Sequence, residues 1–165
     1  MTQTFRQSLD ASVEKVKQMN SDIRKVDFSK WPTYPSGVVK FRELQDDPTY
    51  TSMRDLDGSV SLVLANLEIV LGNASHHRDP AKAVKRFTDS LVGNKHPDGY
   101  FSDGVISAGV LDTALEVDLV TKAEADILTA NRPWHGKVFP AETADHVDKL
   151  LEAIQEICVR IDADE

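Results

Sequence analysis

The stretch with the densest polar chemistry is NKHPDGYFSDG, residues 94–104, where acidic residues, glycines and an aromatic pair lie close together. A calcium-binding helix–loop–helix needs oxygen ligands at positions 1, 3, 5 and 12 of its loop and a glycine at position 6. With Gly99 at position 6, Asp98 falls at position 5, but His96 and Val105 fall at positions 3 and 12. Valine cannot supply a bidentate carboxylate, so we interpret the stretch as a turn between two helices.

The histidines are the next candidates for metal or acid–base chemistry: His76, His77, His96, His135 and His146. No two of them have the three- or four-residue spacing that places two ligands on one face of a helix. HHRDP, residues 76–80, is typical of a solvated loop, with an anion site at the following helix N-terminus as the alternative. We predict no metal and no cofactor. A small enzyme using His76, His77 or His96 with nearby carboxylates is an alternative hypothesis.

Nucleophilic catalysis has no recognisable pattern in the sequence. Cys158 is the single cysteine, and it lies on the apolar stripe of the predicted last helix, where a cysteine behaves as a small hydrophobic residue. There is no nucleophile elbow, phosphate-binding loop or dinucleotide fingerprint. One cysteine also excludes an intramolecular disulfide, which fits a reducing compartment.

The net charge of -8 is concentrated in the second half of the chain. Residues 1–94 carry 13 Lys/Arg and 12 Asp/Glu, whereas residues 95–165 carry 6 Lys/Arg and 15 Asp/Glu. A surface of this kind repels phosphate backbones and attracts basic proteins, although solubility is an equally good reason for it. A small basic cluster, Arg78, Lys82, Lys85 and Arg86, is too weak a footprint to predict direct nucleic-acid binding.

The chain of 165 residues, with 41% hydrophobic and 28% charged residues, fits one globular domain that covers residues 1–165. The N-terminal residues lack the apolar run of a signal peptide, and VSLVLANLEIVLG, the longest apolar-rich run, is too short to span a bilayer. We therefore expect a cytoplasmic protein that does not enter a membrane.

Apolar residues at steps of three and four predict a first helix over residues 4–26. Prolines in residues 27–37 end it, and residues 38–44 fit either a short strand or a helical turn. Residues 45–58 are predicted to be a loop in which Asp57 caps a buried central helix. That helix is expected to end at Gly72 and Asn73, with a strand at residues 60–64 as the alternative reading.

The second half reads as further helices. Asp79 is predicted to cap a helix that stops at Gly93, and residues 103–119 and 122–130 to form a helical hairpin. Thr121 and Glu124 have the spacing of a capping box. The last helix is expected over residues 141–161. The prediction is an all-α, single-domain bundle of about five to six helices, with at most one short strand.

Two loops concentrate aromatic residues, at 27–37 and 131–140. Trp31 and Tyr34 lie in the first, and Trp134 and Phe139 in the second. Such side chains either close the edge of a core, which is commoner, or anchor an interface.

We therefore hypothesise a small acidic protein that inhibits a basic, nucleic-acid-processing protein, as immunity proteins or phage-encoded blockers do, including by nucleic-acid mimicry. Reversing Asp148, Glu152 and Glu156 to lysine is expected to leave the fold intact and abolish binding. A self-associating assembly or chaperone component, dimerising through residues 4–26, is a further alternative. The predicted partner-binding residues are Asp112, Glu116, Asp118, Glu124, Asp126, Asp145, Asp148, Glu152, Glu156 and Trp134.

Overall fold

The computed structural model describes residues 4–26, 28–37, 40–44, 46–82, 106–130 and 140–165. Across these residues the regular structure is helical and contains no β-strand, which confirms the all-α prediction. The short 3₁₀ helices η1 (Phe28–Lys30) and η2 (Phe41–Leu44) connect α1 to α2, so residues 41–44 are a helical turn. The α-helices are α1 (Phe5–Arg24), α2 (Pro48–Arg78), α4 (Ala108–Glu116), α5 (Lys122–Thr129) and α6 (Pro140–Ala163).

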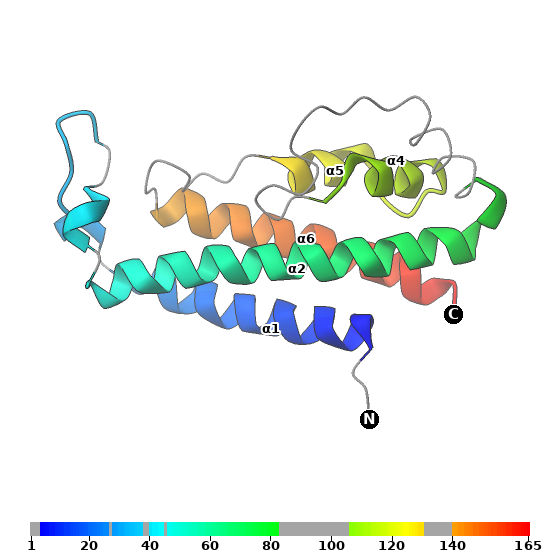
Figure 1. The fold of residues 1–165 in the computed structure, drawn as a ribbon, viewed down its shortest axis with the longest axis horizontal. Helices are drawn as coiled ribbons and strands as arrows, with labels where there is room; N and C mark the ends of the chain where they lie inside the picture. Colours follow the sequence, from blue (N-terminus) through cyan, green and yellow to red (C-terminus); the bar gives the residue numbers. More distant parts are fainter. Residues whose placement is uncertain (1–3, 27, 38–39, 45, 83–105, 131–139) are drawn as a thin grey trace.

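Three long helices form the body of the molecule (Figure 1). α1 runs antiparallel to both α2 and α6, while α2 and α6 run in the same direction. The short pair α4 and α5 lies along one side of this bundle, where α4 packs on α2 and α5 packs on α6. A continuous cluster of buried apolar residues joins all five helices.

A capping box forms the start of α1. Thr4 is the N-cap residue, and Gln7 lies three residues later in the first turn of the helix. The Thr4 hydroxyl accepts the Gln7 N–H at 3.1 Å, and the Gln7 side chain accepts the Thr4 N–H at 2.8 Å. Leu9, Val16 and Ile23 are at most 2% exposed. These residues of the stripe, which the alternative hypothesis assigned to self-association, therefore pack within the chain, whereas Phe5 at its start is 54% exposed.

α2 is much longer than the sequence pattern indicated, because it spans residues that we predicted to be loop. Pro48 occupies the first turn, where a missing N–H costs nothing, and Leu56 and Val60 extend the buried stripe four residues at a time. Asp57 is therefore inside the helix rather than at its cap. Gly72 does not end the helix either, since the buried stripe continues past it.

The predicted boundaries of the other helices hold more closely. Asp79 caps the next helical segment through its carboxylate, which accepts the Lys82 N–H at 3.1 Å. The helix predicted from residue 103 begins later, since Ile106 and Ser107 are not helical and α4 starts at Ala108. α5 begins after the predicted capping box of Thr121. Residues 83–105 and 131–139, including the NKHPDGYFSDG stretch and Trp134, lie outside the described residues.

The loop after α1 closes one end of the bundle. Trp31 is 9% exposed and belongs to the core cluster, as does Leu44 of η2. Tyr34 is exposed and carries the Lys40 ammonium 5.3 Å from its ring centroid. Of the two roles open to aromatic residues in this loop, Trp31 therefore has the core-closing one.

Replacing a buried isoleucine on α6 is predicted to destabilise the fold far more than replacing an exposed valine two residues away. Ile157 is fully buried, so Ile157→Ala removes packed methylenes and leaves a cavity, which reduces the free energy of unfolding by about 2–5 kcal/mol. Val159 is 58% exposed, so Val159→Ala should change it by about 0.5 kcal/mol or less. Urea denaturation at low protein concentration measures both. Equal effects would contradict the packing of α6.

Candidate interaction surface

The acidic residues predicted to bind a partner lie on α4, α5 and α6 and in the turn between α4 and α5. Asp112 is half-buried. The pKa of Lys122 is raised mainly by its hydrogen bond to Asp126, and the charge of Asp112 adds a smaller contribution. Glu116 and Asp118 are exposed. Asp126 is exposed as well, but it accepts a hydrogen bond from the Lys122 ammonium at 2.8 Å.

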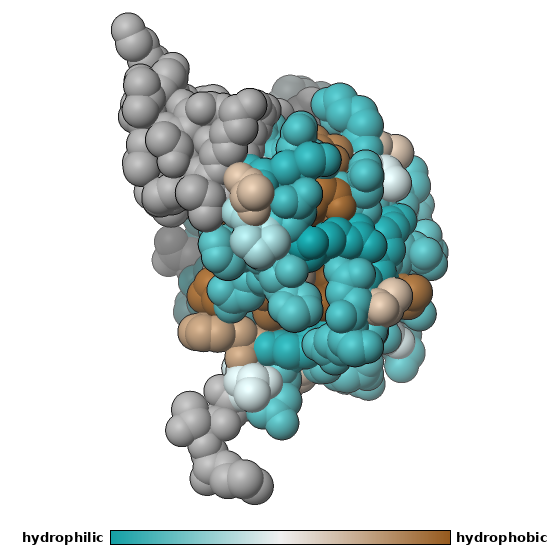
Figure 2. All heavy atoms as spheres, turned by 90° about the vertical axis from the view of Figure 1, so that its right-hand side faces the viewer, coloured by the Kyte–Doolittle hydropathy of each residue, from teal (hydrophilic) through white to brown (hydrophobic). Residues whose placement is uncertain are grey.

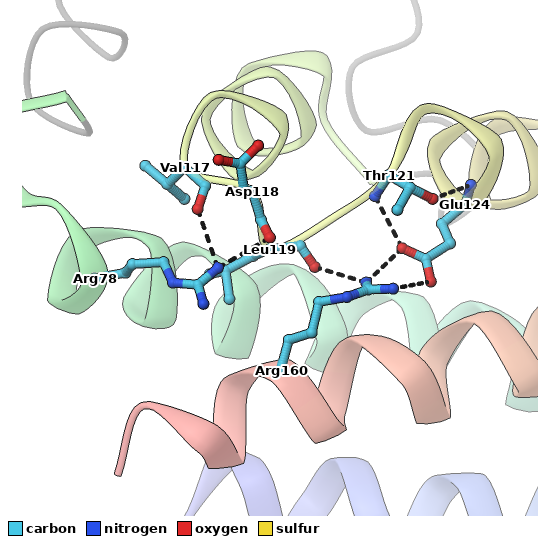
Figure 3. Close-up of polar contacts among 7 residues, drawn as sticks. All are labelled: Arg78, Val117, Asp118, Leu119, Thr121, Glu124 and Arg160. Atoms are coloured by element: carbon cyan, nitrogen blue, oxygen red, sulfur yellow. Dashed lines mark hydrogen bonds and ion pairs between the residues drawn. The ribbon is translucent and has the colours of Figure 1, made fainter.

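Glu124 is buried in an ion pair and is not available to a partner, which corrects its predicted role. Its side chain is 11% exposed and accepts two hydrogen bonds from the Arg160 guanidinium, at 2.6 and 3.0 Å (Figure 3). One of its oxygens also accepts the Thr121 N–H at 2.9 Å in the capping box. Burial raises the pKa of Glu124, but the hydrogen bonds from Arg160 and Thr121 outweigh that effect and lower it. The carboxylate therefore stays charged and docks α5 onto α6.

Two arginines, one from α2 and one from α6, hold the turn between α4 and α5 (Figure 3). Arg160 of α6 donates to the Leu119 carbonyl at 3.1 Å, and Arg78 at the end of α2 donates to the carbonyls of Val117 and Asp118 at 3.1 and 2.9 Å. Backbone carbonyls that the end of α4 leaves unpaired are satisfied in this way.

Asp118 has a positive φ of 61° because it ends α4 in the left-handed conformation. The Leu119 N–H bonds to the Ala114 carbonyl at 2.9 Å, and the Asp118 N–H bonds to the Leu115 carbonyl at 3.2 Å, which is the Schellman pattern. Glycine usually occupies this position, and aspartate is among the residues that tolerate it. The position of Asp118 therefore has a structural reason independent of any partner.

Arginines of the first half of the chain pair with several carboxylates of the last helix and the residue after it. Arg24 contacts Asp145 at 3.0 Å and also Asp148, and Arg6 contacts Asp162 at 2.6 Å. Arg78 contacts Asp164 at 3.0 Å. The acidic half is thus partly neutralised along its edges by cations from the near-neutral half.

Asp148 has a structural role in addition to its ion pair. It accepts a hydrogen bond at 2.9 Å from Asn20 of α1, which is 2% exposed and also donates to the Ala144 carbonyl at 3.1 Å. A lysine at position 148 would leave this buried amide without one acceptor and place a cation beside Arg24. These contacts weigh against the expectation that reversal of Asp148 leaves the fold intact.

Several carboxylates of α4, of α6 and of the turn after α4 make no ion pair among the described residues. On α6 they are Glu142, Glu152 and Glu156, all exposed, with Lys149 between them. On α4 and its turn they are Glu116 and Asp118. Of the nine acidic residues predicted to bind a partner, Glu152 and Glu156 are exposed, lie on a long regular helix and make no ion pair within the described part of the chain.

A pocket of about 380 Å³ opens at the end of the bundle where α1 begins and α2 and α6 end. Its apolar part comes from Phe5, Val70, Ala74 and Ile161, and its polar rim includes His77. Figure 2 looks at this end and shows apolar patches enclosed by polar side chains. Sequence analysis missed the pocket, because its lining comes from helices whose pairing cannot be read from periodicity.

The described histidines and the cysteine offer little support for catalysis. His76 and His77 lie in the last turn of α2 rather than in a loop, and in the part of the chain described no three metal-ligating side chains cluster. Cys158 is buried, and burial raises the pKa of its thiol, which disfavours the reactive thiolate. His96 lies outside the described residues.

No protein-family model, curated protein or solved structure matches this chain.

Removing the charge of either member of the Glu124–Arg160 pair is predicted to destabilise the protein unequally. Arg160→Met leaves a buried carboxylate uncompensated and should reduce the free energy of unfolding by about 3–5 kcal/mol. Glu124→Gln keeps an oxygen for the Thr121 N–H and should cost about 1–3 kcal/mol. Asp126→Asn, which breaks the exposed pair with Lys122, is the control and should cause no measurable change.

The stabilisation that depends on Glu124 is predicted to depend on pH. Because the pKa of Glu124 is lower in the folded than in the unfolded protein, the pair stabilises the fold above the ordinary glutamate pKa. This contribution is lost as the pH falls through the folded-state pKa. The difference in unfolding free energy between wild type and Glu124→Gln should therefore shrink on acidification, measured by urea denaturation at a series of pH values. A constant difference would contradict it.

Proposed function

We propose that this chain is a non-enzymatic protein that inhibits a basic, nucleic-acid-processing protein by binding it through the outward face of α6. Immunity proteins and phage-encoded blockers are the functional class meant here. The contact residues are Glu152 and Glu156, extended by Glu142 along the same face. Glu116 and Asp118 supply further negative charge from α4 and its turn.

The observation that carries the proposal is the sorting of carboxylates on α6. Asp145 and Asp148 pair with Arg24, whereas Glu152 and Glu156, further along α6, are exposed and make no ion pair among the residues that the structure describes. Arg160, whose pKa is raised mainly by its hydrogen bonds to Glu124, also interacts electrostatically with Glu156. A basic surface that approaches the middle of α6 therefore meets Glu152, a carboxylate that no described cation pairs with.

Electrostatics of this type suit fast capture of a partner. A net charge of -8 accelerates association with a cationic surface, and the rate falls as salt screens the charges. Exposed carboxylates on a rigid helix also resemble the regular spacing of phosphates along a nucleic acid. The partner expected from this chemistry is a protein that normally grips a phosphate backbone with lysine and arginine.

Reversing the two unpaired glutamates is predicted to abolish partner capture without unfolding the protein. Glu152→Lys/Glu156→Lys should lose, at low salt, a basic protein that the wild type retains from lysate of cells carrying the gene. The matched control is Glu43→Lys/Asp46→Lys, which changes the net charge equally but at exposed positions of the first half. Circular dichroism checks that both variants keep their helices.

High salt and duplex DNA should each release the captured protein, since both compete for its cationic surface. Identical capture by the two double variants would contradict the proposal. So would captured proteins that are acidic or neutral.

A further inference from the structure

The pocket at the start of α1 is a concave site built from the ends of three helices. α1 begins at the end of the bundle where α2 and α6 finish, because it runs antiparallel to both (Figure 1). The apolar wall of the pocket consists of Phe5 of α1, Val70 and Ala74 of α2, and Ile161 of α6. The lining is mainly apolar, and a volume of about 380 Å³ has room for a molecule of roughly ten non-hydrogen atoms.

Phe5 is the part of this wall that the core does not use. Its side chain is 54% exposed, whereas Leu9, the next residue of the same apolar stripe, is fully buried. Val70 and Ile161 are buried as well. More than half of the Phe5 side chain is therefore available to a bound molecule. Because the face of an aromatic ring carries negative partial charge, it attracts a cation that is placed over it.

The charged groups that line the pocket leave a carboxylate without a partner. All three nitrogens of the Arg6 guanidinium donate to carboxylates of α1 and α6. Asp164 is paired with Arg78 at 3.0 Å. Glu165 is exposed and makes no ion pair among the residues that the structure describes. Since Arg6 is the only lysine or arginine among the described lining residues, the lining has an uncompensated negative charge.

The helix ends around the pocket favour a ligand of the same sign. α2 and α6 contribute their C-terminal ends, which carry partial negative charge, whereas α1 contributes a single N-terminal end with partial positive charge. The Thr4 hydroxyl already accepts the N–H of Gln7 at the start of α1. The two negative ends outweigh the positive one, so a cation is more stable in the pocket than an anion.

We propose that this pocket binds a small organic amine, with its ammonium group towards Phe5 and Glu165 and its apolar body against Val70, Ala74 and Ile161. The carboxylate supplies the opposite charge, and the aromatic ring supplies a cation–π contact. The apolar wall removes the hydrocarbon part of the ligand from water. None of these residues belongs to the outward face of α6, so this site does not depend on the proposed function.

A lipid bilayer is another apolar environment that this part of the chain suggests. The segment Arg54–Arg78, whose end lines the pocket, is long and apolar enough by composition to cross a membrane, as core helices of globular proteins also are. Leu67 and Leu71 within it are fully buried by other helices of the chain. A concave site with a carboxylate among its lining residues fits a single charged amine better than hydrocarbon, which cannot compensate that charge.

NMR titration of isotope-labelled protein with phenethylammonium tests the site. At about pH 8 an ordinary histidine such as His77 is neutral and a primary amine is still protonated. The amide signals of Phe5, Ala74 and Ile161 should shift together and saturate, with a dissociation constant on the order of 1 mM. Phenethyl alcohol, which has the same shape without the charge, should bind about fivefold more weakly, and phenylpropanoate more weakly still.

Three results of this titration would overturn the proposal. The first is the absence of a saturable shift up to about 20 mM amine, and the second is a set of shifts spread over the whole molecule. The third is binding of the alcohol or the carboxylate as tightly as the amine, because the ligand would then be recognised by its apolar body alone.

Two single substitutions identify the groups that hold the ammonium. Glu165→Gln should weaken binding of the amine about fivefold and leave binding of the alcohol unchanged. Phe5→Leu keeps an apolar side chain but removes the ring, and should weaken binding of the amine about two- to fivefold. All the substituted residues are exposed, so the variants should keep the fold, which the same spectra show.

Each substitution has a matched control away from the pocket. Glu142→Gln makes the same change of charge at the start of α6, and Tyr34→Leu removes an aromatic side chain that is 53% exposed. Both controls should bind the amine as the wild type does. Unchanged binding by Glu165→Gln, or equal weakening by a substitution and its control, would show that the pocket does not recognise the ammonium group.

Discussion

Burial of α2 on three of its sides is the constraint on which the rest of the structure depends. Its core-facing residues, among them Leu67 and Leu71, are fully buried by α1, α4 and α6 together. No single neighbour covers this surface, so each of the three helices must occupy its own sector around α2. The fourth sector stays open to solvent, and Leu62 and Ile69 lie there. Core formation and the exposed apolar stripe are thus two results of one arrangement.

Arginine side chains then fix how the outer elements sit on this core. Arg160 anchors α5 through Glu124, and Arg78 holds the end of α4 through backbone carbonyls. Arg24 and Arg6 tie the two ends of α1 to α6. A planar guanidinium suits these positions because it donates several hydrogen bonds in fixed directions, which a lysine cannot do. The acidic second half of the chain is therefore held to the first half, and its residual charge faces outward.

Local patterns in the sequence predicted the features that depend on local interactions. The stripe of α1, the capping box at Thr121 and Glu124 and the cap at Asp79 are all present. The prediction was wrong for the start of α2: residues 45–58 were predicted to be a loop, whereas the helix begins at Pro48 and buries Leu56 and Val60. Low helix propensity of single residues is a weak predictor of a loop when buried apolar residues continue at helical spacing across them.

Predictions of the site were limited because contacts between helices cannot be read from the sequence of a single helix. The sequence identified Glu124 as a capping residue, but no pattern connects it to Arg160, which is 36 residues away. Asp148 and Glu152 look equivalent on a helix with acidic residues, and contact with Asn20 of α1 distinguishes them. Such contacts depend on which helices become neighbours. Net charge and its asymmetry were readable from composition, whereas the division into paired and unpaired carboxylates required the fold.

The large sequence separation between α1 and α6 affects the order in which this molecule folds during synthesis. α1 lies against α6 through residues more than 120 positions apart, such as Arg24 and Asp145. During synthesis α1 and α2 can form a hairpin early, but this hairpin leaves the surface that α6 covers exposed until the last helix has emerged from the ribosome. The core around α1 and α2 is therefore completed only when α6 becomes available.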